Sequence, residues 1–428
     1  MKLMKKVVLA SVPFLLAACG NGESSTEEVT QSEQSSEETT KIVFARGVDT
    51  SIATEKFIEA FEESHPHIEV EFREMPSDTG EYHDQLVTAF SSQSSEIDVF
   101  LADTIWPAEF AQANYALELD RFIEKDDVDM DAHFDGPVKA GNFDGRQWAM
   151  PFFVDAGVFF YRTDIVDEAP ETWDDLIEAA NQYKGEEGTQ FGYLMQASQY
   201  EGMVTNAIEF IASYGGKIID ENNNVVADSP ETIKGIEKMV EVIQSDFVPE
   251  NINSFTEIET ENAWVQGESV FARNWPYLMG SSNNEEISEI VGNVSMTTLP
   301  SGDEGSASAL GGWMLMINRY SENPEAAWEF VNWLSGEEGQ KINSMNSTTP
   351  PTLSKLYDDE DIQNVSPLFA DPEFREILHN SVPRPVTPIY PEVSDILQIE
   401  LSKAINGDQS AEDTARNIQE KIENALNE

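Results

Sequence analysis

The 428-residue chain is poor in several chemically important residue types. It has one cysteine, Cys19, five histidines, and 25 lysines and arginines against 80 aspartates and glutamates, for a formal net charge of −55. A single cysteine excludes an intramolecular disulfide and a metal site built on several thiolates. The excess of acids opposes binding to nucleic acid or anionic lipid headgroups, because both require clustered lysines and arginines.

Motifs for catalysis and cofactor binding are also missing. The sequence contains no HExxH, GxSxG, P-loop or GxGxxG pattern, so metalloprotease, nucleophile-elbow and nucleotide-cradle hypotheses lack the residues they need. His65 and His67 flank Pro66 without further ligands at metal-binding spacing, and a solvated loop is the simpler interpretation. With so many acids, carboxylate pairs occur by chance and indicate no glycosidase. We expect a protein that is not an enzyme and has no metal or cofactor.

The apolar run at the N-terminus is too short to cross a membrane. It extends from Val7 to Ala18, 12 residues, whereas a membrane-spanning helix needs about 20. Three lysines precede it and small residues end it, which is typical of a secretory signal peptide over residues 1–18. We therefore expect export.

Cys19 follows this signal directly, in the tetrapeptide Leu16-Ala17-Ala18-Cys19. The tetrapeptide resembles the bacterial lipobox, and the resemblance implies cleavage before Cys19 and attachment of diacylglycerol to its thiol. A stray cysteine inside an ordinary signal peptide is the alternative. Residues 19–40 are polar and rich in glutamate, so we expect a lipid-anchored flexible tether spanning about 25 Å. The expected location is the extracellular face of the cell membrane, with the lipid as the only membrane contact.

The charge of the mature chain would be even more negative. Removal of residues 1–18 takes away three lysines and no acids, which leaves a net charge of −58. Because dissolved salt screens repulsion between like charges, our hypothesis is a halophilic or haloalkaliphilic exterior.

From Lys41 onward the pattern is that of a folded α/β protein. Short apolar strands alternate with helical patterns, which predicts a parallel sheet, and a second series of the same kind occupies the middle of the chain. The expected strands are 42–45, 68–72, 97–101, 158–161 and 313–317, and the clearest expected helices are 81–90, 201–214 and 230–245. A chain of this length usually divides into two cores, so we expect two lobes. Ligands of such sheets bind beyond the carboxyl ends of the strands, which places Gly47, Asp103 and Thr104 near a site.

Aromatic residues stand beside polar residues or glycines in expected loops. Asn274-Trp275-Pro276-Tyr277 follows a strand pattern, and the glycines of Gly311-Gly312-Trp313 allow close approach of the backbone to a ligand. Sugars present apolar C–H faces ringed by hydroxyls, which suit flat aromatic rings combined with carboxylates and arginine. The alternative is that each tryptophan fills a core.

Seven segments in a fixed order make this pattern specific. They are Asp103 after an apolar strand, Pro151–Arg162, Glu171–Trp173, Gln199–Gly202, Asn274–Tyr277, Leu310–Trp313 and Val382–Pro391. In this order the chain resembles the trehalose/maltose-binding proteins, which are extracellular solute-binding proteins of ABC sugar importers. The resemblance spans nearly all of residues 41–428.

The resemblance implies an α/β, two-lobed, periplasmic-binding-protein-like (Venus flytrap) fold with crossing hinge segments. We place an N-terminal lobe at about residues 41–153 and 313–350, and a C-terminal lobe at about residues 154–312 and 351–428. The resemblance also implies a set of ligand-binding residues. Some stack on sugar rings, some accept hydrogen bonds from sugar hydroxyls, and some offer a backbone group or a guanidinium to the sugar. These are Trp275, Tyr277 and Trp313 for stacking, Asp103 and Asp155 as acceptors, Gly312 for its backbone, and Arg384 as a donor.

Some of these roles have alternatives. Asp103 is otherwise a helix cap, and Arg384 otherwise a member of a buried ion pair. Phe153 stands where the family has a tyrosine, which removes one hydroxyl contact. The loop over residues 46–54 is shorter than in the family and lacks its glutamate, so Arg46, Asp49 and Asp78 are candidates only.

The resemblance predicts the substrate-binding lipoprotein of an ABC transporter, capturing an α-linked disaccharide or similar glucoside. The expected partners are the sugar and the transmembrane permease subunits, and the protein is expected to be a monomer. A secreted glycoside hydrolase and a surface cation-binding protein are the alternatives.

Overall fold

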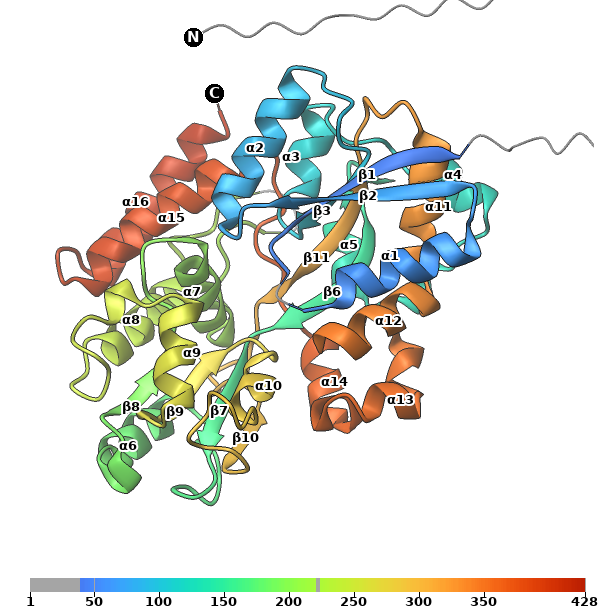
Figure 1. Ribbon diagram of the computed structural model, residues 1–428. Helices are drawn as coiled ribbons and strands as arrows, with labels where there is room; N and C mark the ends of the chain where they lie inside the picture. Colours follow the sequence, from blue (N-terminus) through green and yellow to red (C-terminus); the bar gives the residue numbers. More distant parts are fainter. Residues whose placement is uncertain (1–38, 50, 221–223, 428) are drawn as a thin grey trace, which may run out of the picture. The chain divides into compact units, whose positions relative to one another are not determined.

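Two β-sheets organise the part of the chain described by the computed structural model, residues 39–49, 51–220 and 224–427 (Figure 1). These residues belong to one unit, residues 39–428. The predicted signal peptide, the predicted lipid-attachment residue Cys19 and the expected tether up to residue 38 lie outside the described residues. Within the described residues, no helix combines the length and apolar character needed to cross a membrane.

The first sheet has the strand order β2-β1-β3-β11-β6. Its strands are β1 (Thr40–Gly47), β2 (Ile68–Met75), β3 (Val99–Asp103), β6 (Met150–Ala156) and β11 (Leu310–Ile317). β1 is parallel to β2 and β3, which confirms the parallel sheet predicted from the N-terminal strand–helix alternation. β11 arrives from far along the chain and runs antiparallel between β3 and β6.

The second sheet has the order β10-β7-β9-β8. Its strands are β7 (Val158–Arg162), β8 (Phe191–Leu194), β9 (Ser269–Asn274) and β10 (Val294–Thr297), and a separate hairpin joins β4 (Asn142–Phe143) to β5 (Arg146–Gln147). The helix expected after Thr172 is confirmed, because Thr172 and Asp175 form a capping box at its start. Ser229 likewise caps the helix that Pro230 begins.

Helices lie beside both sheets (Figure 1). Those that precede β7 or follow β11 as far as residue 347 are α1 (Ala53–Ser64), α2 (Thr79–Ser91), α3 (Pro107–Gln112), α4 (Asp120–Lys125), α5 (Asp135–Ala140), α11 (Pro324–Ser335) and α12 (Glu337–Ser347). Those between β7 and β10 are α6 (Trp173–Tyr183), α7 (Glu201–Ser213), α8 (Pro230–Ile243), α9 (Glu257–Val265) and α10 (Leu278–Ser282). The C-terminal helices are α13 (Glu360–Gln363), α14 (Pro372–His379), α15 (Tyr390–Ile405) and α16 (Ala411–Ala425).

The chain crosses between the two sheets twice, and a third connection leads to helices that pack on α7 and α8. Gly157 joins β6 to β7, the chain before β11 returns to the first sheet, and Ala309 in that second connection bridges to Val382 in a third. Helices α13 and α14 contact α12 and β6, whereas α15 and α16 contact α7 and α8. We therefore propose that the third connection lies near residue 380, later than the boundary of about 350 expected from the sequence.

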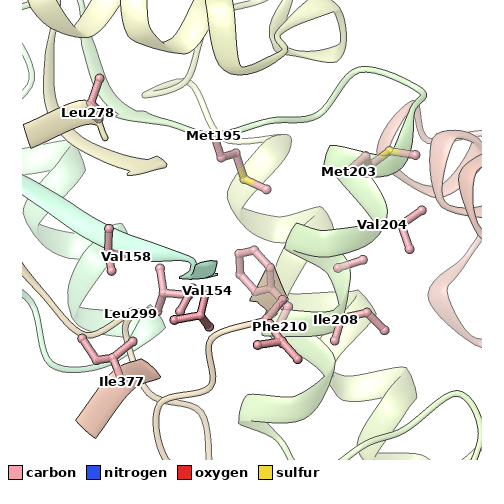
Figure 2. Packing of buried hydrophobic residues seen from close by; sticks show 14 of the residues in the cluster. Val154, Val158, Met195, Met203, Val204, Ile208, Phe210, Leu278, Leu299 and Ile377 are labelled. Carbon is pink, nitrogen blue, oxygen red and sulfur yellow. The ribbon is translucent and has the colours of Figure 1, made fainter. Parts of the chain in front are cut away.

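Apolar packing continues across the connections. One cluster of buried residues includes Val154 in β6, Val158 in β7 and Phe210 in α7 (Figure 2). A second cluster lies within the first sheet and its helices, where Phe44, Phe57 and Phe330 meet edge to face or tilted. The aromatic rings of this second cluster hold α1 and α11 against the sheet that carries β11.

Candidate functional site

Trp313 is half-buried on strand β11, which lies between β3 and β6 in the first sheet. The strand register places it opposite Asp103 of β3 and Phe153 of β6. Its ring stacks on Tyr82 with centroids 6.0 Å apart, and Trp106 meets it edge to face at 5.6 Å. The Tyr82 hydroxyl is itself held by the carbonyls of Ala45 and Leu101. The buried rings of Tyr82 and Trp106 therefore hold the indole in place, while part of Trp313 stays exposed.

The glycine at position 312 allows β11 to lie close to the backbone of β6. Its φ of +110° disfavours any residue with a side chain, and a Cβ there would lie 2.4 Å from the carbonyl oxygen of Phe153. We expected Gly311 and Gly312 in a loop, and they instead lie within the strand, because both pair with β6. The bulge that follows, between Trp313 and Met314, shifts the register of the ladder.

Trp275 approaches the same strand from the second sheet. It follows the end of β9, and its Nε1 donates to Glu257 at 3.3 Å. The guanidinium of Arg273 lies 4.3 Å from the ring centroid, a cation–π contact. A Cβ at Gly311 would lie 2.8 Å from the ring. The ring of Trp275 thus packs against Gly311, two residues before Trp313 on β11, although the two indoles come from different sheets.

Asp155 lies beside this meeting point, opposite Gly311 in the ladder between β6 and β11. Burial raises the pKa of its carboxyl from the ordinary 3.8 to about 7, although the positive charge of Arg273 acts in the opposite direction. Burial also raises the pKa of the Tyr277 hydroxyl, and the charges of Glu261, Glu257 and Asp155 add to the effect. Tyr277 follows Trp275 by two residues and stands directly before α10.

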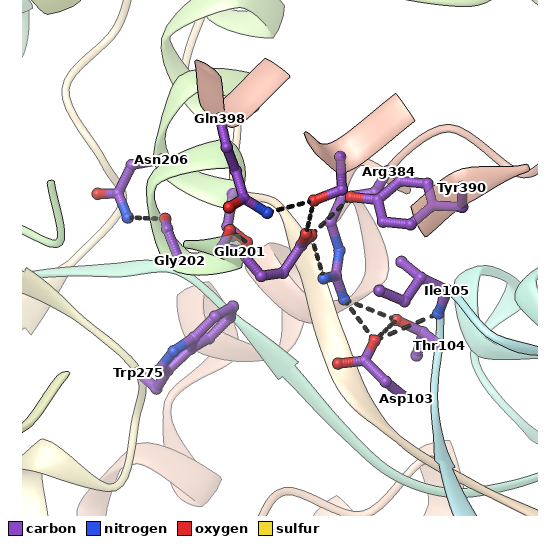
Figure 3. Close-up of polar contacts among 12 residues, drawn as sticks. Asp103, Thr104, Ile105, Glu201, Gly202, Asn206, Trp275, Arg384, Tyr390 and Gln398 are labelled. Carbon is purple, nitrogen blue, oxygen red and sulfur yellow. Dashed lines mark hydrogen bonds and ion pairs between the residues drawn. The ribbon is translucent and has the colours of Figure 1, made fainter. Parts of the chain in front are cut away.

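Arg384 sits at the third connection and links Asp103, at the end of β3, to Glu201 of helix α7 (Figure 3). It donates to Asp103 and to Glu201, the first residue of α7, each at 2.7 Å, and to the Thr104 hydroxyl at 3.1 Å. The Tyr390 hydroxyl also donates to Glu201, at 2.6 Å. The alternative considered for Arg384, a buried ion pair, is thus present. Its Nε, however, is buried without a partner among the described residues, which leaves one donor for a ligand or water.

Comparisons with known proteins fit this arrangement. Residues 47–341 match the model of the bacterial extracellular solute-binding protein family. The chain belongs to this family.

Two curated relatives and one solved structure illustrate the similarity. A probable ABC transporter-binding protein of Deinococcus radiodurans is 33% identical over 71% of this chain and 74% of its own length. The maltotriose-binding protein of Pyrococcus abyssi is 25% identical over 70% of this chain and 63% of its own length. The structure of maltose-bound T. maritima MalE3 matches with a TM-score of 0.82 and 34% identity, over 91% of this chain and 100% of that one. The predicted family, an extracellular solute-binding protein of the ABC-transporter type, and the predicted two-lobed fold are confirmed.

The three remaining candidate ligand-binding residues of this solute-binding protein, Arg46, Asp49 and Asp78, lie around β1 and α2. Arg46 pairs with Asp49 at 3.0 Å and donates to Thr54 at 2.8 Å. Its charge also acts on Tyr82, the ring beneath Trp313. Asp78 instead caps α2 by accepting from the backbone of Glu81, which accounts for its position without a ligand.

Several residues of the site were not predicted. Glu257 and Arg273 contact Trp275, and Tyr82 stacks on Trp313, but nothing in the sequence separates them from other acids, bases and core aromatics. Glu201 had a detectable signal, since it lies in the segment Gln199–Gly202 that contributed to the resemblance. Among the described residues, no group of three or more acidic, histidine or cysteine side chains is placed to hold a metal ion.

Proposed function

We propose that this extracellular solute-binding protein captures an α-linked disaccharide of the trehalose or maltose type, or a similar glucoside, for import by an ABC transporter. The observation that carries the proposal is the convergence of Trp275 and Trp313 on β11. Sugars bind flat apolar rings through their C–H faces, and two indoles from different sheets suit a ligand held between lobes.

A carboxylate accompanies each indole. Asp155 lies opposite Gly311, which contacts Trp275, and Asp103 lies opposite Trp313. Carboxylates accept sugar hydroxyls in charge-assisted hydrogen bonds without taking a proton away. We therefore expect capture and release with no bond made or broken, and Gly312, Tyr277 and Arg384 add backbone, aromatic and guanidinium contacts.

The solved relative supports sugar as the ligand class, since the 34% identical MalE3 structure holds maltose. A ligand that contacts both lobes favours the state in which the lobes enclose it, and the permease would recognise that state. A dissociation constant of about 1 μM corresponds to about −8 kcal/mol, which stacking and several charge-assisted bonds can supply. We propose that the protein acts as a monomer.

We also propose that lipid on Cys19 holds the protein at the outer face of the cell membrane. The support is the sequence Leu16-Ala17-Ala18-Cys19 behind an apolar run and three lysines. Wild-type protein should enter the detergent phase on cloud-point extraction of cells, and Cys19→Ser should remain aqueous. Equal partitioning of the two would contradict the anchor.

A thermal-shift screen tests the sugar proposal. Residues 39–428 are screened at low and high NaCl against trehalose, maltose, sucrose, maltotriose, glucosylglycerol and glucosylglycerate. A ligand that binds only the folded state raises the melting temperature by mass action. A hit supports the proposal if the recovered sugar is chemically unchanged. Hydrolysis of the sugar would instead identify a glycoside hydrolase, and saturable Ca²⁺ or Fe³⁺ binding without any sugar response would favour a cation-binding protein.

Conservative tryptophan variants locate the site. Trp275→Phe and Trp313→Phe should weaken binding of the sugar that scores in the screen, because phenylalanine offers a smaller face. Trp333→Phe is the matched control, since Trp333 is also partly exposed but packs on Phe61 beside α1. Equal losses in all three variants would argue against a site on β11.

A further inference from the structure

A buried ion pair joins α7 to β9. Arg273 donates to Glu209 through Nε at 2.8 Å and through Nη2 at 2.5 Å, and the two side chains are only 1% and 2% exposed. Burying two charges has a large desolvation cost, and apolar residues of similar volume often stabilise a fold as well or better. A role in function would explain why charges occupy this place.

Glu209 contacts two of the three connections. The backbone N–H of Ala309 donates to Glu209 Oε1 at 3.2 Å. Gly157 packs so closely that a Cβ there would lie 1.9 Å from the same oxygen and 2.5 Å from Arg273 Nη2. Ala309 in turn bridges to Val382 of the third connection. The ion pair is therefore in direct contact with the segments that any movement between the sheets must bend.

Arg273 contacts the candidate site from its other side. Its guanidinium carbon lies 4.3 Å from the ring centroid of Trp275, and its charge acts on the Asp155 carboxyl. The orientation of the guanidinium is fixed, because Nη1 donates to Gln196 Oε1 at 3.0 Å while Gln196 Nε2 donates to the Arg273 carbonyl at 3.2 Å. The same guanidinium thus bonds to Glu209 beside the connections and lies over the ring of Trp275.

We infer that Arg273 and Glu209 are positioning residues. They fix the place of the Trp275 ring relative to the connections between the sheets, and they thereby set the affinity for the ligand without touching it. The inference rests on the proposed function for its ligand. A lysine at position 273 keeps the charge that Glu209 needs but lacks the planar guanidinium and has one donor nitrogen in place of the fork. The Arg273→Lys variant therefore separates charge neutralisation from positioning.

The test combines a measurement without ligand with one that uses sugar. Protein labelled with 5-fluorotryptophan gives one fluorine resonance for each tryptophan, and Trp275→Phe assigns that of Trp275. Maltose and trehalose are then titrated by calorimetry. Arg162→Lys is the matched control, because Arg162 is a buried arginine of the same sheet, bonded to Asp164 through two nitrogens, at the far end of β7. Glu209→Gln is the second variant in case Arg273→Lys does not fold.

The inference predicts that Arg273→Lys shifts or broadens the Trp275 resonance and weakens sugar binding at least tenfold, while Arg162→Lys changes neither. An unmoved resonance together with a dissociation constant within twofold of wild type would overturn it, as would equal effects in Arg162→Lys. Wild-type protein that binds neither maltose nor trehalose would count against the proposed disaccharide. The fluorine resonance alone would then decide whether Arg273 positions Trp275.

Discussion

Replacing Asp155 by asparagine should stabilise the folded protein at neutral and alkaline pH and weaken sugar binding at the same time. Burial raises the pKa of this carboxyl from 3.8 to about 7 in the folded protein. The folded state therefore holds the proton more tightly than the unfolded state does. Stability from this group is fully present below about pH 4, is lost as the pH rises to about 7, and stays at its lower level above that.

The difference between the pKa of Asp155 in the folded and unfolded states sets the size of the stability change. A difference of about 3 between folded and unfolded states corresponds to about 4 kcal/mol of unfolding free energy. Asp155 is only partly buried as a residue, so water lowers the cost of its charge, and we expect about 1 to 3 kcal/mol. Asparagine has the same shape and no proton to lose. At pH 8.5, Asp155→Asn should be more stable than wild type by this amount, and at pH 4 the two should differ little.

Urea unfolding at a fixed NaCl concentration measures this difference. Each variant is compared with wild type at the same pH, which cancels the titration of the other carboxylates. A stability difference that is equal at pH 4 and pH 8.5 would refute the reasoning, because it would show that Asp155 does not titrate between them. Calorimetry at pH 8.5 completes the test, since loss of a charged acceptor should weaken sugar binding by about tenfold.

Four further outcomes follow from particular contacts and from the charge. Trp275→Ala should weaken sugar binding by about 1 to 3 kcal/mol with little change in melting temperature, and an unchanged affinity in calorimetry would place the ring outside the site. Gly312→Ala should lower the unfolding free energy by about 2 kcal/mol or more in urea titrations, because a Cβ would meet the Phe153 carbonyl at positive φ; a neutral effect would contradict this backbone geometry. Glu400→Gln should lower the unfolding free energy by about 3 kcal/mol at pH 7. Lys403 and Lys421 hold the pKa of the fully buried Glu400 at about 2, against the effect of burial, so the stability that the charged group contributes above its ordinary pKa of 4.5 is lost as the pH falls to 2. Sugar affinity should not change. The melting temperature should rise with NaCl because of the net charge of −55, and a fall would contradict the halophilic hypothesis.

Local pattern was sufficient for much of the fold. The apolar runs at 42–45 and 68–72 lie in β1 and β2, the run at 97–101 overlaps β3, which begins two residues later at Val99, and Ser229-Pro230 begins α8 as expected. These elements depend on neighbouring residues in the sequence, through alternation, capping and turn chemistry. The ordered segments from Asp103 to Pro391 were also enough to predict the family.

Local pattern was not sufficient for Gly311 and Gly312. Two adjacent glycines predict a loop, yet both lie inside β11 because Asp155 and Val154 of β6 pair with them from 156 and 158 residues earlier in the sequence. Pairing at such separation depends on which strands the fold brings together, and propensity does not contain that information.

The sequence by itself determined the acidic charge, the strand and helix patterns, and the residue types suited to a sugar, above all Trp275 and Trp313. The tertiary structure alone decided that Trp275 packs against the strand that carries Trp313, that Arg384 is shared between Asp103 and Glu201, and that Arg273 links Trp275 to Glu209. The physical reason is distance along the chain. A residue type shows which interactions are available to it, but partners 64 or 281 positions away are chosen only when the sheets and helices have packed.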